Sequence, residues 1–141
     1  MSGQSFLRIV TTGFAPFLKE LGFTMETPSI SGRLYRATFR STKEVLSVSY
    51  EPGDEVLFVM IFSHRDGELS DIDDRSNTPR LSDLNMRYMH IITKEERLAN
   101  ELLFEAIEPR DNEEKSLLKA AKELRLVLPK YLHDVRRNGG S

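Results

Sequence analysis

Apolar residues recur at helical spacing near the start of the chain, which predicts an amphipathic helix over residues 5–21. Ser5 can cap its start, and Gly22 supplies the left-handed residue that commonly follows a helix. Because Pro16 removes one backbone donor, we expect a kink or a helix that restarts near Ala15. The apolar positions of this helix are Phe6, Val10, Phe14, Phe17, Leu18 and Leu21.

Three runs with alternating polarity follow, and the turns between them set an expected register. Residues 51–54 (Glu-Pro-Gly-Asp) fit a type II turn, and residues 41–42 (Ser-Thr) fit a two-residue connection. Folding at these turns pairs Val48 with Leu57 and Tyr35 with Val48. The shared apolar face then consists of Tyr35, Ala37, Phe39, Leu46, Val48, Leu57, Val59 and Ile61, and the first helix is its natural cover.

The third run is apolar on its other side too, which is typical of a strand buried on both faces. Its cover could be the C-terminal helices, a second copy of the chain or a partner, and we expect the helices. In a homodimeric scaffold, Phe58 and Met60 would instead form a self-complementary patch. Arg36 and Arg40 lie on the same face but give little neutralisation of phosphates, so we expect no nucleic-acid partner.

The second half of the chain begins with a polar, turn-rich excursion over residues 64–83, which has six acids against three arginines. Residues 86–92 fit either a fourth strand or the end of a helix. Thr93 and Glu96 form a capping box that opens a helix. Asp111 or Asn112 is expected to cap a last helix, which is interrupted at Pro129 and then resumes. The apolar positions expected to face the core from the first of these helices are Leu98, Leu102, Leu103, Ala106 and Ile107.

Composition narrows the class of protein. The 141 residues are 39% hydrophobic, lack cysteine and carry a net charge of −2. We therefore expect one domain over residues 1–137, a flexible tail over 138–141, and no disulfide or thiolate metal site. The longest apolar run, residues 56–62, is far shorter than the roughly 20 residues that span a bilayer. Without a signal-like segment, the chain is predicted to be cytoplasmic, with no membrane partner.

The sequence has no complete catalytic or metal-binding motif, which favours a protein without catalytic activity. The calcium-loop pattern that begins at Asp71 fails, because Ser76 stands where Gly is needed and Ser82 where Glu is needed. We expect no metal, no cofactor and no catalytic site. The alternative is a small hydrolase or transferase in which His64 and acidic-loop carboxylates, such as Asp66 and Asp71, converge.

The order of elements resembles that of the small α+β immunity proteins that bacteria encode beside polymorphic toxins. The resemblance rests on the end of the first helix at residues 21–23 (Leu-Gly-Phe) and on two strand blocks, residues 36–41 (Arg-Ala-Thr-Phe-Arg-Ser) and 45–54 (Val-Leu-Ser-Val-Ser-Tyr-Glu-Pro-Gly-Asp). The expected fold is α+β: an antiparallel meander of three or four strands, an N-terminal helix and two C-terminal helices. The resemblance implies an inhibitor that binds and neutralises one cognate toxin.

The acidic excursion is the expected contact with such a partner. Its carboxylates could complement a basic active-site cleft, and its two apolar side chains could supply buried anchors. The predicted partner-binding residues are Glu68, Leu69, Asp71, Ile72, Asp73 and Asp74.

Overall fold

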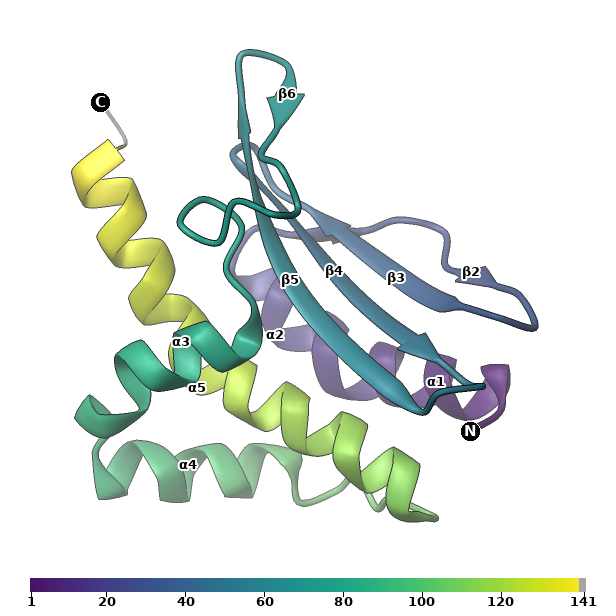
Figure 1. Cartoon of the computed structure of the whole chain (residues 1–141). Coiled ribbons are helices and arrows are strands. Elements are labelled where there is room, and N and C mark those ends of the chain that lie inside the picture. Colours follow the sequence, from purple (N-terminus) through teal and green to yellow (C-terminus); the bar gives the residue numbers. More distant parts are fainter. Residues whose placement is uncertain (140–141) are drawn as a thin grey trace.

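The structure is a computed structural model that describes residues 1–139, and side chains through Arg137. The fold is α+β: one antiparallel sheet of six strands with a layer of helices packed against it (Figure 1). The sheet therefore has more strands than the three or four expected. The strands are β1 (Thr24–Met25), β2 (Ser29–Ile30), β3 (Tyr35–Arg40), β4 (Glu44–Glu51), β5 (Val56–Arg65) and β6 (Glu68–Leu69). The helices are α1 (Gly3–Ile9), the π-helical turn η1 (Val10–Phe14), α2 (Ala15–Glu20), α3 (Leu81–Tyr88), the 3-10 turn η2 (Met89–Ile91), α4 (Lys94–Phe104) and α5 (Asn112–Gly139).

The N-terminal helix restarts at Ala15, as predicted. Its amide donates to the carbonyl of Val10, five residues back, which closes the π-helical turn just before Pro16. Because proline has no amide hydrogen, a wider turn at this point avoids a missing bond in a regular α-helix. The cap, however, is Ser2: its Oγ accepts from the amide of Ser5 at 3.1 Å, so the helix starts earlier than expected.

The strands follow one another as a meander in the order β1-β3-β4-β5-β6, and β2 also pairs with β3. Val48 pairs with Val59 and with Ala37, so both predicted registers are wrong by two residues. Each connection has four residues outside the ladder, not two, because Arg40 pairs with Val45 and Glu51 with Val56. A shift of two residues keeps every side chain on its face, and the predicted apolar face is confirmed.

Both connections are held by local features that the turn patterns did not reveal. The Oγ of Ser41 accepts from the amides of Lys43 and Glu44 at 3.4 and 3.0 Å, which lengthens the first turn. In the second, Glu55 adopts a left-handed backbone with φ 54°.

The helices between the sheet and the C-terminus number three, α3 to α5, where two were expected. Residues 86–91 belong to α3 and η2, which decides between the two predictions in favour of helix, and Ile92 follows in extended conformation. The capping box at Thr93 and Glu96 is confirmed at the start of α4. The helix α5 runs unbroken past Pro129, so the predicted interruption is wrong. Its neighbours Leu128 and Tyr131 are buried, and this packing holds the helix together where one backbone bond is lost.

Figure 1 shows that α5 bends along its length, which is the usual response of a helix to an internal proline. Its backbone reaches Gly139, so it includes the first half of the tail predicted over 138–141, and 140–141 lie outside the described residues. Over residues 1–139, no helix combines the length and apolar character needed to cross a bilayer.

The orientation of α4 contradicts its hydrophobic pattern. Leu98, Leu102 and Leu103 are 65%, 62% and 59% exposed, whereas Asn100 and Phe104 are buried. Asn100 donates to the carbonyl of Lys122 and accepts from Arg125 on α5, at 3.0 and 2.9 Å. These bonds turn a polar residue toward the interior and leave the leucines outside.

Candidate protein-binding surface

The helices all gather on one side of the sheet (Figure 1) and share one core with its inner face. The expectation that C-terminal helices would cover the outer face is therefore wrong. On that face lies an open hollow of about 630 Å³, which we call the outer-face groove. It is lined by Leu34, Arg36, Thr38, Arg40, Val45, Ser47, Ser49, Glu51, Phe58, Met60, Phe62, Leu69, Ile72 and Arg80.

The floor of the outer-face groove is formed by β3, β4 and β5, and the large apolar side chains of β5 differ in exposure. Phe58 is 37% exposed, whereas Met60 is only 7% exposed. Met60 is covered because the chain returns beside it: it bridges to Arg80, and the amide of Ile61 donates to the carbonyl of Pro79 at 3.0 Å. Of the two residues predicted for self-association, only Phe58 therefore offers an accessible side chain.

Arginine side chains give the groove a basic character. The Nε of Arg36 donates to the Oγ of Ser49 at 3.3 Å, and Arg40 forms an ion pair with Glu26 at 2.6 Å. Arg80 differs, because its Nη1 is buried without a hydrogen-bond partner among the described residues. An unpaired buried donor is costly, because it has lost its hydrogen bonds to water.

The rim of the groove is a β-hairpin of β5 and β6, at the start of the segment that was expected to be a long, turn-rich excursion. Asp66 and Gly67 form its two-residue turn with φ of 54° and 81°, as a type I′ turn requires. Asp-Gly between two short strand-like runs is the signal that would have predicted it. The hairpin and the following loop bring Leu69 and Ile72, which are 47% and 52% exposed, to the edge of the groove.

Two of the predicted partner-binding carboxylates are engaged in local turns. Asp71 accepts from the amide of Asp73 at 2.9 Å. Asp74 accepts from the amide of Ser76 at 3.2 Å and from the side-chain amide of Asn77 at 2.8 Å. The Asn77 side chain is the main cause that lowers the pKa of the Asp74 carboxyl below its ordinary value. These two acids shape the loop in addition to charging it.

Glu68 and Asp73 differ from these acids, because their exposed carboxylates form no hydrogen bond or ion pair within residues 1–139. They are therefore free to meet a partner. The structure thus places the six predicted partner-binding residues on one exposed segment, with the apolar pair facing the groove.

The loop that carries these acids is anchored at both ends. Thr78 is fully buried, and its Oγ1 lies 2.5 Å from the Oγ of Ser70 and donates to the carbonyl of Asp71 at 2.7 Å. Arg75 forms an ion pair with Asp83 at 2.6 Å at the start of α3. Burial raises the pKa of the Asp83 carboxyl, but bonds from the Arg80 amide and from Arg75 lower it below its ordinary value. A loop held in this way presents its side chains with little ordering left to do.

The enzyme alternative gains no geometric support from the described residues. No hydrogen bond or ion pair joins His64 to Asp66 or Asp71 in the part of the chain that is described, and none of the three lines the outer-face groove. Across residues 1–139, no cluster of three or more His, Asp or Glu side chains could hold a metal ion.

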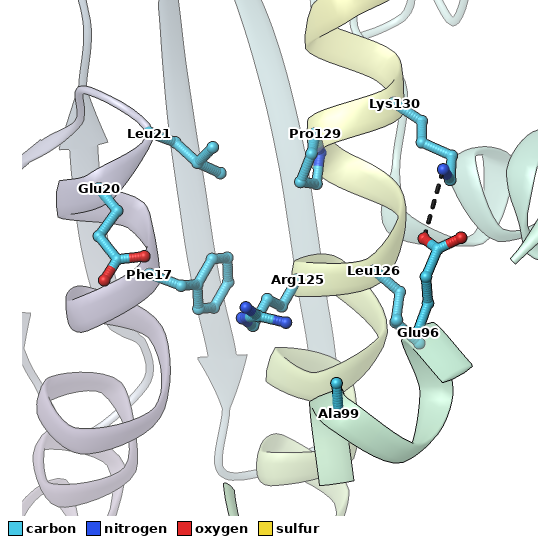
Figure 2. A pocket seen from close by; sticks show the side chains of 9 residues that line it. All are labelled: Phe17, Glu20, Leu21, Glu96, Ala99, Arg125, Leu126, Pro129 and Lys130. Atoms are coloured by element: carbon cyan, nitrogen blue, oxygen red, sulfur yellow. Dashed lines mark ion pairs between the residues drawn. The ribbon is translucent and has the colours of Figure 1, made fainter. Parts of the chain in front are cut away.

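A second hollow, of about 340 Å³, lies between α2, α4 and α5 and is shown in Figure 2. Three of its four charged side chains are paired, Lys130 with Glu96 at 3.4 Å and Arg125 with Asn100 at 2.9 Å, and the fourth, Glu20, is exposed. We therefore interpret it as a seam between helices.

Comparisons with protein-family models, with curated proteins and with solved structures found no match to this chain.

Proposed function

We propose that this chain is a non-catalytic protein-binding domain, most consistent with a cytoplasmic immunity protein that binds and neutralises one cognate bacterial toxin. The observation that carries the proposal is the uncovered outer face of the sheet. A sheet is normally covered wherever it is apolar, and an exposed apolar hollow on a folded domain marks an interaction surface.

The apolar part of the surface has the form of a protein interface. Phe58 lies in the floor and Leu69 and Ile72 at the rim, so the accessible apolar groups surround one hollow. Binding energy at interfaces is concentrated in a few such anchors that fill or receive a pocket. A partner side chain inserted between these three residues would lose its contact with water and gain contacts on three sides.

The charged groups supply specificity. Glu68 and Asp73 lie outside the groove with unpaired carboxylates, and Arg36 and Arg80 lie inside it. A matching partner carries basic residues around an acidic or carbonyl-bearing projection. Complementary charge of this kind speeds association and discriminates against wrong partners.

The proposal is tested by affinity capture with the chain as bait, followed by mass spectrometry. The wild type is compared with Phe58→Asp and Leu69→Asp, which place a charge in the floor or at the rim. Met86→Asp is the matched control, because Met86 is 85% exposed on α3 and does not line the groove. We expect a stoichiometric protein toxin on wild-type and Met86→Asp baits and its loss from the other two, with circular dichroism showing that all four baits are folded.

Two outcomes would contradict the proposal. If the captured toxin stays on the Phe58→Asp and Leu69→Asp baits, another surface binds it. If the bait instead retains a small molecule that it converts, the enzyme alternative replaces the immunity function.

A further inference from the structure

The helix α4 carries an apolar stripe that points away from the rest of the molecule. Leu98 and Leu102 are one turn apart and are 65% and 62% exposed. At about 100° per residue they lie opposite Asn100 and Phe104, the two residues that α4 buries. The bonds from Asn100 to α5 fix this orientation, so the stripe is a stable feature of the folded chain.

The charges beside the stripe form a pattern. On the wheel of α4, Lys94 and Glu105 project on the same flank of the stripe, at opposite ends of the helix, and both are exposed. Within the described residues neither takes part in an ion pair, whereas Glu96 and Glu101 pair with lysines of α5. The outer side of α4 therefore has a positive end, an apolar middle and a negative end.

We propose that α4 is the contact between two copies of this chain, packed antiparallel about a twofold axis that passes between Leu98 and Leu102. In this arrangement Leu98 of one copy lies level with Leu102 of the other. The twofold axis places the same flanks together, so Lys94 lies within about one residue rise, roughly 1.5 Å along the axis, of Glu105 of the second copy. Two symmetric ion pairs then frame four leucines.

The charges also decide between the two orientations of the helices. Parallel packing brings opposite flanks together, so Lys94 would lie beside Glu95 of the second copy, and Glu105 would face Ala106 and have no partner of opposite charge. Only the antiparallel arrangement pairs both Lys94 and Glu105 with an opposite charge. In the antiparallel dimer the two Glu95 side chains on the other flank are about ten residues, roughly 15 Å, apart along the axis. That separation exceeds the roughly 8 Å screening length at physiological ionic strength, so their repulsion is small.

Sedimentation equilibrium of the full chain tests whether the dimer exists and uses this stripe. We expect a monomer–dimer equilibrium for the wild type that the double variant Leu98→Gln/Leu102→Gln weakens at least tenfold, because each substitution acts twice. Glutamine is a good helix former of similar length, so α4 keeps its structure. Met86→Gln, at a residue 85% exposed elsewhere, is the control that leaves the equilibrium unchanged. A wild type that stays monomeric, or a dimer that ignores the double variant, overturns the proposal.

Charge reversal tests the pairing across the axis. Lys94→Glu alone and Glu105→Lys alone should each weaken the dimer several-fold, and the combined variant should restore it. Both single changes place a charge that suits the helix dipole, so a loss of dimer does not come from a weaker helix. Failure of the combined variant to recover would contradict the pairing.

Disulfide trapping tests the orientation directly, and the absence of cysteine from the chain makes the background clean. A mixture of Lys94→Cys and Glu105→Cys should give a cross-linked heterodimer on mild oxidation, while Lys94→Cys alone should stay uncross-linked. Efficient cross-linking in a mixture of Lys94→Cys and Glu95→Cys instead would show the parallel arrangement and refute this one.

Discussion

The two faces of the same sheet differ in burial. On the inner face Ala37, Leu46, Val48 and Ile61 are fully buried under the helices. On the outer face Phe58 remains 37% exposed, among serines and arginines that line the outer-face groove. Because strand residues alternate between faces, one set of strands supplies both the core and the exposed surface. The inner face accounts for the stability of the fold, and the outer face is left available for binding.

The largest expected difference between the faces is in stability. Leu46→Ala should lower the free energy of unfolding by about 2–5 kcal/mol, because it leaves a cavity in a core that cannot fully collapse. Phe58→Ala on the outer face should cost less than about 1.5 kcal/mol, since Phe58 already contacts water. Urea unfolding followed by circular dichroism measures both. Equal losses would mean that the outer face is as much a core as the inner one.

Two ion pairs, one on the helical side and one at the sheet edge, differ in burial in the same way. On the helical side Arg8 pairs with Glu114, whose carboxyl is fully buried. Burial raises the pKa of Glu114, but the Arg110 amide and Arg8 lower it below its ordinary value, so Glu114 stays charged. Arg8→Ala would leave that charge without its main partner and should cost about 2 kcal/mol.

The matched control for this change is at the sheet edge, where Arg40 and Glu26 are about half exposed. Arg40→Ala should cost less than about 0.5 kcal/mol, because exposed pairs contribute little. Both variants are measured by urea unfolding. A smaller loss for Arg8→Ala than for Arg40→Ala would contradict the difference between the faces.

A substitution in the hairpin at the rim should destabilise the hairpin without affecting the core of the sheet. Gly67 has φ 81°, and an added Cβ would meet no other atoms, so Gly67→Ala is unfavourable through the backbone alone. We expect a loss of about 1 kcal/mol. Hydrogen exchange should show it at the amides of β6, with those of β4 unchanged. A matching loss of protection in β4 would show that the rim and the core unfold together.

The smallest expected effect is a dependence of amide protection on pH in the loop around Asp74. The pKa of Asp74 is lowered in the folded chain, so its contribution to loop order is present above its ordinary pKa of about 4 and is lost as the pH falls through the lower folded value. The amides of Ser76 and Asn77, which donate to Asp74, should keep constant protection from pH 7 to about 4.5 and lose it in more acid solution. Asp74→Asn removes this dependence. Loss of protection at higher pH would point to another group.

The fold could be predicted from the sequence where it depends on interactions between residues close together in the chain. The restart at Ala15 and the capping box at Thr93 depend on residues a few positions apart, and both are confirmed. Strand registers were wrong by two residues, because Ser41 and Glu55 lengthen turns through a side-chain bond and a left-handed backbone. The assignment of side chains to the two faces was still correct, because a shift of two residues does not move a side chain to the other face.

The surface was harder to predict, because tertiary contacts override apolar patterning. The stripe of Leu98 and Leu102 indicates a buried face, and only the bonds of Asn100 to α5 reverse it. Likewise, the apolar outer side of β5 indicates a covered strand. No periodicity reveals that the described helices lie on the opposite side of the sheet, so the groove is visible only in the structure.

The most direct test of the binding account is the dissociation constant of the captured toxin, measured by titration calorimetry for Phe58→Asp beside Met86→Asp. Each variant places one carboxylate on an exposed apolar site, and only the first lies in the groove. We expect at least a hundredfold weaker binding for Phe58→Asp and an unchanged constant for Met86→Asp. Equal constants for the two variants would show that the toxin binds elsewhere and that the open face of the sheet is not its site.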